Sequence, residues 1–71
     1  MATSDEVRQA ALDLAERGVE TDAAVQELLS CCGDHRVSVV RARQTLAGTA
    51  REGTVERATE LLDQVLERGN W

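Results

Sequence analysis

Apolar residues recur at intervals of three and four along almost the whole chain, in blocks that end close to glycines. This spacing places side chains on one face of an α-helix, and strict alternation typical of a β-strand is absent apart from the ambiguous run at 37–40. Proline, which breaks helices, does not occur. The pattern predicts four amphipathic helices, at residues 4–17, 22–32, 35–50 and 54–68. We expect an all-α fold, a compact bundle of four short helices that forms a single domain over residues 1–71.

Signals for helix ends support these ranges. Thr3 and Glu6 are three residues apart, as in a capping box, and the apolar stripe that follows ends at Gly18. Asp34 is the expected cap of the third helix, and Thr54 is expected to open the fourth. Each segment therefore has its own start or stop signal in addition to its apolar stripe.

The composition predicts a thin core. The chain has 71 residues and contains no Phe, Tyr or Ile, so its interior must be built from Leu, Val and Ala. A chain of this size buries about 60% of the surface that its unfolded form exposes. A second copy or a bound partner would add buried apolar surface. The single aromatic residue, Trp71, is expected either to cover the core or to anchor a partner.

Charge is sorted by segment. Residues 1–34 carry a net charge of −6, residues 35–51 carry +4 and residues 52–71 carry −3. A basic segment between acidic neighbours indicates internal pairing, self-association or an acidic partner. All eight cationic side chains are arginines, which is typical of a GC-rich bacterial genome.

Two observations bear on location. No apolar run approaches the roughly 20 residues that a membrane-spanning helix needs, and the first six residues lack the basic and apolar regions of a secretory signal. We expect a cytoplasmic protein that does not contact membranes.

Within the third predicted helix, Arg43 falls inside the apolar arc. That arc consists of Val39, Val40, Ala42, Leu46, Ala47 and Ala50. A guanidinium group does not stay unpaired in an apolar environment, and two interpretations follow. Arg43 either reaches a carboxylate of another helix in the same chain or faces a second molecule.

The second interpretation gives the functional prediction. We expect a non-enzymatic protein–protein interaction module, an adaptor, regulatory subunit or inhibitor, that acts through this helix. Its partner would be another protein with an acidic or apolar surface, or a second copy in a homodimer. The predicted partner-binding residues are Arg36, Val39, Val40, Arg41, Arg43, Leu46, Ala50 and Trp71.

The alternative function is a small DNA-binding transcription regulator that uses the same arginine-rich helix. If Gly33 were the turn glycine of a helix-turn-helix, Val39 and Ala42 would occupy positions that need apolar residues. Leu29 and Asp34 do not fit the other two positions. A net charge of −5 also opposes binding to nucleic acid, so we treat this function as the less favoured one.

A cluster at Cys31, Cys32, Asp34 and His35 is the one group with metal-ligand chemistry. Structural zinc usually takes four protein ligands, often in two pairs, and no second pair occurs, so we expect no metal site. Cys32 continues the apolar stripe of its helix and is expected in the core. Adjacent cysteines bridge only through a strained ring, which argues against a disulfide.

The sequence offers little for catalysis. The serines are not surrounded by an oxyanion motif, and the glycines are spaced like helix stops rather than as a phosphate-binding loop. We expect no enzymatic activity, no cofactor and no small-molecule substrate.

Overall fold

The computed structural model describes residues 3–48 and 53–69 and confirms the all-α prediction, with four helices and no strand in that part of the chain. The helices are α1 (Ser4–Glu16), α2 (Thr21–Cys32), α3 (Arg36–Ala47) and α4 (Gly53–Arg68). Their order and positions follow the predicted ranges, with differences at the ends that are given below.

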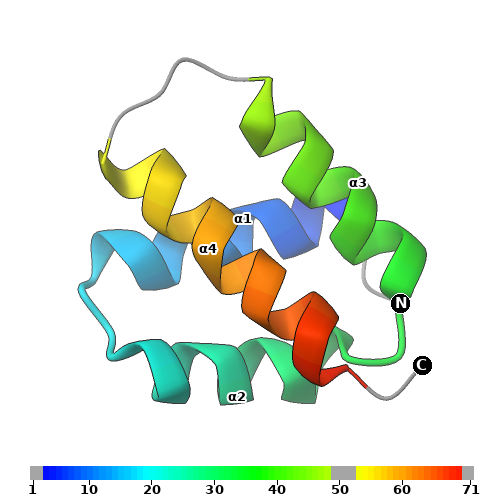
Figure 1. Cartoon of the computed structure of the whole chain (residues 1–71), viewed down its shortest axis with the longest axis horizontal. Helices are drawn as coiled ribbons and strands as arrows, with labels where there is room; N and C mark the ends of the chain where they lie inside the picture. The colour runs from blue at the N-terminus through cyan, green and yellow to red at the C-terminus, as the bar shows by residue number, and fades with distance from the viewer. Residues whose placement is uncertain (1–2, 49–52, 70–71) are drawn as a thin grey trace.

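The helices form two antiparallel pairs that cross each other, α1 with α2 and α3 with α4 (Figure 1). α4 packs against all three other helices, whereas α2 and α3 touch each other least. One side of α3 is therefore held by α1 and α4, and its other side faces outward.

None of the four helices has the length and apolar character required to cross a lipid bilayer, as far as the described residues extend.

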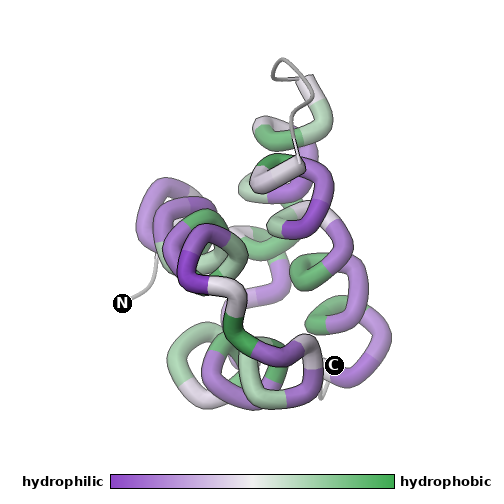
Figure 2. Tube along the Cα trace, turned by 90° about the vertical axis from the view of Figure 1, so that its left-hand side faces the viewer, coloured by the Kyte–Doolittle hydropathy of each residue, from purple (hydrophilic) through white to green (hydrophobic). Residues whose placement is uncertain are grey.

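The core is built from small and medium apolar side chains that all four helices contribute. Along each helix, hydrophobic and hydrophilic residues follow one another in step with the helical turns (Figure 2). The buried side chains are Val7, Ala11, Leu14, Ala15, Ala24, Val25, Leu28, Cys32, Val39, Ala42, Leu46, Val55, Ala58, Leu61, Leu62 and Val65. This confirms the core position of Cys32. Of the arc predicted for the third helix, it confirms Val39, Ala42 and Leu46, whereas Val40 is half-buried and Ala47 is exposed. Val55 and Ala58, one turn apart on α4, are both among the buried side chains.

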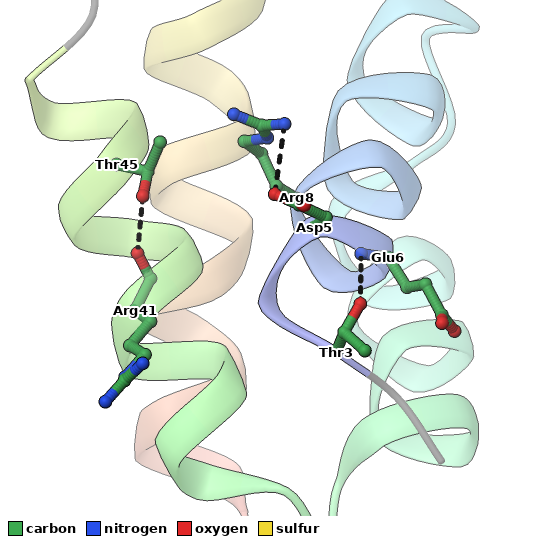
Figure 3. A network of polar contacts seen from close by, with 6 residues as sticks. All are labelled: Thr3, Asp5, Glu6, Arg8, Arg41 and Thr45. Atoms are coloured by element: carbon green, nitrogen blue, oxygen red, sulfur yellow. Dashed lines mark hydrogen bonds and ion pairs between the residues drawn. The ribbon is translucent and has the colours of Figure 1, made fainter.

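The ends of α1 follow the sequence signals. The backbone N–H of Glu6 donates to Thr3 Oγ1 at 3.2 Å, so Thr3 caps the helix as predicted (Figure 3). At the other end Gly18 adopts a φ of +69°, a conformation that side chains with a Cβ disfavour. The Gly18 N–H donates to the Ala15 carbonyl and the Val19 N–H to the Leu14 carbonyl, both at 3.2 Å. These two bonds form a Schellman motif that ends the helix.

α3 differs from the prediction at both ends. His35, not Asp34, is the N-cap, and its side chain makes no capping hydrogen bond. The helix stops at Ala47, three residues earlier than predicted, because Gly48 forms the C-cap and donates its N–H to carbonyls of the last turn. Ala50, predicted inside this helix, lies outside the described residues. α2 and α4 each begin one residue earlier than predicted.

Two arginines of α4 hold the start of α2 in place. Arg57 Nη2 donates to the Val19 carbonyl at 2.8 Å and to Thr21 Oγ1 at 3.4 Å. Arg68, the last residue of α4, forms an ion pair with Asp22 at 3.3 Å. These contacts link segments that are far apart in the sequence, and they give two of the arginines partners within the same chain.

Candidate interaction surface

The outward side of α3 carries an apolar residue surrounded by polar and basic ones. The Val37 residue is 68% exposed and is the one exposed large apolar residue in the described part of the chain. A shallow hollow of about 330 Å³ beside it is lined by Arg36, Val37, Val40, Arg41 and Gln44. We call these five residues the α3 outer face.

The arginines of this face differ from the other described arginines in their partners. Four arginines form ion pairs within the chain: Arg8 with Asp5, Arg17 with Asp13, Arg43 with Asp63 and Arg68 with Asp22. The first of these pairs is drawn in Figure 3. Arg57 donates to a carbonyl and a hydroxyl. Arg36 and Arg41 are exposed, and neither guanidinium group has a carboxylate partner within residues 3–48 and 53–69.

Arg41 is still held at its backbone. Thr45 Oγ1 donates to the Arg41 carbonyl at 3.0 Å, one turn along α3 (Figure 3). The bond fixes the hydroxyl and leaves the guanidinium group of Arg41 directed away from it. The basic charge of the outer face is thus carried on an ordered helix.

The structure separates the predicted partner-binding residues into three groups. Val39 and Leu46 are 0% and 2% exposed and pack in the core of the same chain, so the surface open to a partner excludes them. Val40 is half-buried and belongs to the outer face, together with the exposed Arg36 and Arg41. Ala50 and Trp71 lie outside the described residues. Of the predicted apolar arc of α3, Val39, Ala42 and Leu46 therefore face the inside of the bundle.

Arg43 pairs with a carboxylate of its own chain. Its Nε donates to Asp63 Oδ1 of α4. The side chains of Arg43 and Asp63 are 40% and 48% exposed, so the pair lies at the edge of the core in contact with solvent. This is the first of the two interpretations of Arg43, an internal pair between α3 and α4.

Because both groups are well exposed to water, the pair should stabilise the fold only modestly. We expect Arg43→Ala and Asp63→Ala each to lower the free energy of unfolding by about 1 kcal/mol or less. A double-mutant cycle by urea denaturation should give a coupling of about 0.5 kcal/mol. A coupling of zero would contradict the ion pair, and Glu67→Ala, at an exposed site on the same helix, is the control.

Next to this pair lies an acidic groove between α3 and α4. Its volume is about 280 Å³, and its walls are Arg43, Leu46, Ala47, Val55, Glu56, Thr59, Glu60 and Asp63. Arg43 is the one basic residue in the lining, against three carboxylates. We call this the α3–α4 groove, and its chemistry is the opposite of that of the outer face.

The two surfaces adjoin on α3. Arg36, Val40, Arg43 and Ala47 are spaced by four, three and four residues, so they form one row along the helix. The first two belong to the outer face and the last two line the groove. A basic, partly apolar surface and an acidic groove therefore lie side by side.

The two cysteines lie at the end of α2 and line neither of these surfaces. Cys31 is exposed and Cys32 is 1% exposed, and both are reduced. Burial, and to a lesser degree the hydrogen bond and charge of Cys31, raise the pKa of the Cys32 thiol to about 12. Within the described ranges, no group of three or more His, Cys, Asp or Glu side chains is arranged to hold a metal ion.

Comparison with known proteins finds no matching family model, curated protein or solved structure. The description of the surface therefore depends on the geometry of this chain alone. The residues that were not among the predicted site residues include Val37 of the outer face and the groove carboxylates Glu56, Glu60 and Asp63. The acidic content of the fourth segment was visible in the sequence, but not its position beside α3.

Proposed function

We propose that the protein is a non-enzymatic, cytoplasmic interaction module that binds through the α3 outer face, and that the partner is a second copy of the chain. The observation that carries the proposal is the pair of arginines, Arg36 and Arg41, that have no internal carboxylate partner and flank the exposed Val37. Exposed apolar side chains with basic neighbours are suited to an acidic, partly apolar surface.

Charge complementarity favours a second copy. α3 contains three arginines and no acidic residue, whereas α1, α2 and α4 each contain more acidic than basic residues. The α3–α4 groove combines Glu56 and Glu60 with the exposed side chain of Ala47. The chain thus carries both a basic apolar face and an acidic apolar groove.

The position of the two surfaces allows a closed dimer. Because they adjoin along one row of α3, a two-fold axis near this helix would place each outer face against the groove of the other copy. Such a contact is self-complementary and does not propagate into a filament. Two valines per copy supply little apolar area, so we expect weak association, with a dissociation constant on the order of 0.1 mM, or about −5.5 kcal/mol.

Size-exclusion chromatography with light scattering tests the proposal. The mass should rise from the monomer value of 7.7 kDa toward twice that value as the concentration is raised through about 0.1 mM. Salt near 0.5 M, where the Debye length falls to about 4 Å, should weaken the association by screening the arginines. A monomer at all concentrations would overturn self-association.

Variants of the outer face should weaken the dimer. Val37→Asp removes the central apolar side chain and places a carboxylate opposite an acidic groove, and Arg41→Glu reverses a charge at the same contact. We expect each to raise the dissociation constant at least about tenfold, equivalent to 1.4 kcal/mol, in sedimentation equilibrium. Gln26→Glu adds one negative charge at an exposed position of α2 and is the control. Equal weakening by this control would point to net repulsion instead of a defined contact.

The same variants and mass measurements distinguish the alternative function, DNA binding, from self-association. Titration of a duplex in low salt should show no binding by the wild type. Binding with a steep salt dependence that Arg41→Glu abolishes, together with a monomeric mass, would replace the proposal with the alternative function.

A further inference from the structure

The end of α2 holds two thiols at short range, and the interaction surface does not use them. Cys31 Sγ and Cys32 Sγ are 3.1 Å apart. Both thiols lie toward the same acceptor, the Leu28 carbonyl, at 3.5 Å from Cys31 and 3.0 Å from Cys32. The shared acceptor orders the two sulfur atoms on one side of the helix, and we call them the thiol pair.

One member of the thiol pair, Cys31, can be reached from solvent, whereas Cys32 is buried. Cys31 is exposed and lines a hollow of about 210 Å³ between α1 and α2. The wall of this hollow includes the apolar side chains of Ala10 and Leu14 together with Leu28. A small ligand with an apolar substituent could therefore meet Cys31 first and place that substituent on the wall.

The number and spacing of the sulfur atoms limit which ligands fit. Zinc needs about four ligands, and Zn–S bonds of about 2.3 Å in tetrahedral geometry hold two sulfurs about 3.8 Å apart. Soft metal ions that bind only two thiolates bind them on opposite sides, so the two sulfurs lie farther apart still. A trivalent arsenic atom that carries one organic group needs two sulfurs, and its pyramidal bonds hold them close together. No third ligand is then required, in agreement with the described part of the chain.

We propose that Cys31 and Cys32 form a two-thiol binding site for monosubstituted trivalent arsenicals. An arsonous acid, R–As(OH)₂, would exchange its two As–O bonds for two As–S bonds. Each thiol proton leaves with one hydroxyl group as water, and arsenic remains trivalent, so neither oxidant nor reductant is needed. The exposed Cys31 reacts first, and Cys32 closes the ring in a second, intramolecular step.

Intact-mass spectrometry with phenylarsine oxide as the probe tests this site. We expect one adduct per chain in native buffer, with the helical circular dichroism retained, and displacement by a small dithiol but not by a monothiol such as glutathione. Cys31→Ala alters an exposed position and leaves the core intact. Because this variant cannot close the ring through two As–S bonds, it should bind phenylarsine oxide at least about 100-fold more weakly than the wild type.

Several results would overturn the proposal. Adduct formation in urea but not in native buffer would show that the folded thiol pair is inaccessible. Equal, glutathione-resistant binding by Cys31→Ala would show that two thiols are not required. Because the proposed dimer surface lies on α3 and α4, the proposal stands or falls independently of self-association.

Discussion

Replacing Leu62 with alanine is expected to lower the free energy of unfolding by about 3 to 5 kcal/mol. Leu62 is 0% exposed and belongs to α4, the helix that packs on the other three. A core made of Leu, Val and Ala has no large neighbouring side chain to fill the resulting cavity. For a chain of this length the total stability is about 4 to 10 kcal/mol, so much of it would be lost.

Urea denaturation followed by circular dichroism measures this effect. Leu12→Ala makes the same chemical change at a partly buried position that packs on the edge of the core, and should cost about 1 kcal/mol. Equal losses in the two variants would contradict the described core. A loss below about 1 kcal/mol for Leu62→Ala would do the same.

The second large effect concerns pH. Stability should fall by up to about 4 kcal/mol between pH 9 and pH 12 because of the Cys32 thiol. In the unfolded chain this thiol loses its proton near its ordinary pKa of 9.0, whereas burial keeps it protonated in the fold up to about pH 12. In this window the unfolded state binds fewer protons than the folded state, so rising pH favours unfolding. Below pH 9 the thiol keeps its proton in both states, and its contribution to the free energy of unfolding is fully present.

The composition makes this effect unusually easy to isolate. The chain has no Tyr and no Lys, so the groups that normally titrate between pH 9 and pH 12 are missing. The exposed Cys31 is the one other thiol in the sequence. Urea denaturation in the presence of a reductant should show the loss in the wild type and a nearly flat profile in Cys32→Ala. An unchanged slope in that variant would exclude Cys32 as the cause.

Much of the fold could be predicted from local sequence. The stripes of α1 and α2, the cap at Thr3 and the stop at Gly18 depend on contacts within a helix and its ends, and the structure confirms them. Even Val55 followed the same rule, since it precedes Ala58 by three residues and Leu62 by seven.

The ends of α3 were harder to predict. Asp34 and His35 are both plausible starts, and the choice between them depends on how the chain turns after Gly33. Gly48 ended the helix early although the apolar spacing continues beyond it. In this segment the low helix propensity of glycine outweighed the periodic pattern.

The interaction surface shows the limit of the helical pattern. A stripe identifies which residues of α3 are apolar, but it does not show whether they face their own chain or a partner. Val39 and Leu46 face their own chain. The charge of Arg43 required a partner, but the identity of Asp63 depends on how α3 and α4 pack, which the sequence does not encode locally. The same packing determines that Val37 remains outside.

The most direct test of the central proposal is a dilution series of ¹H–¹⁵N correlation spectra, from about 1 mM to 20 μM, which brackets the expected dissociation constant. We predict that the largest concentration-dependent shifts occur at the amides of Val37, Val40 and Arg41 on one side and of Glu56 and Glu60 on the other. Spectra that do not change over this range, or changes confined to α2, would contradict an interaction through the α3 outer face.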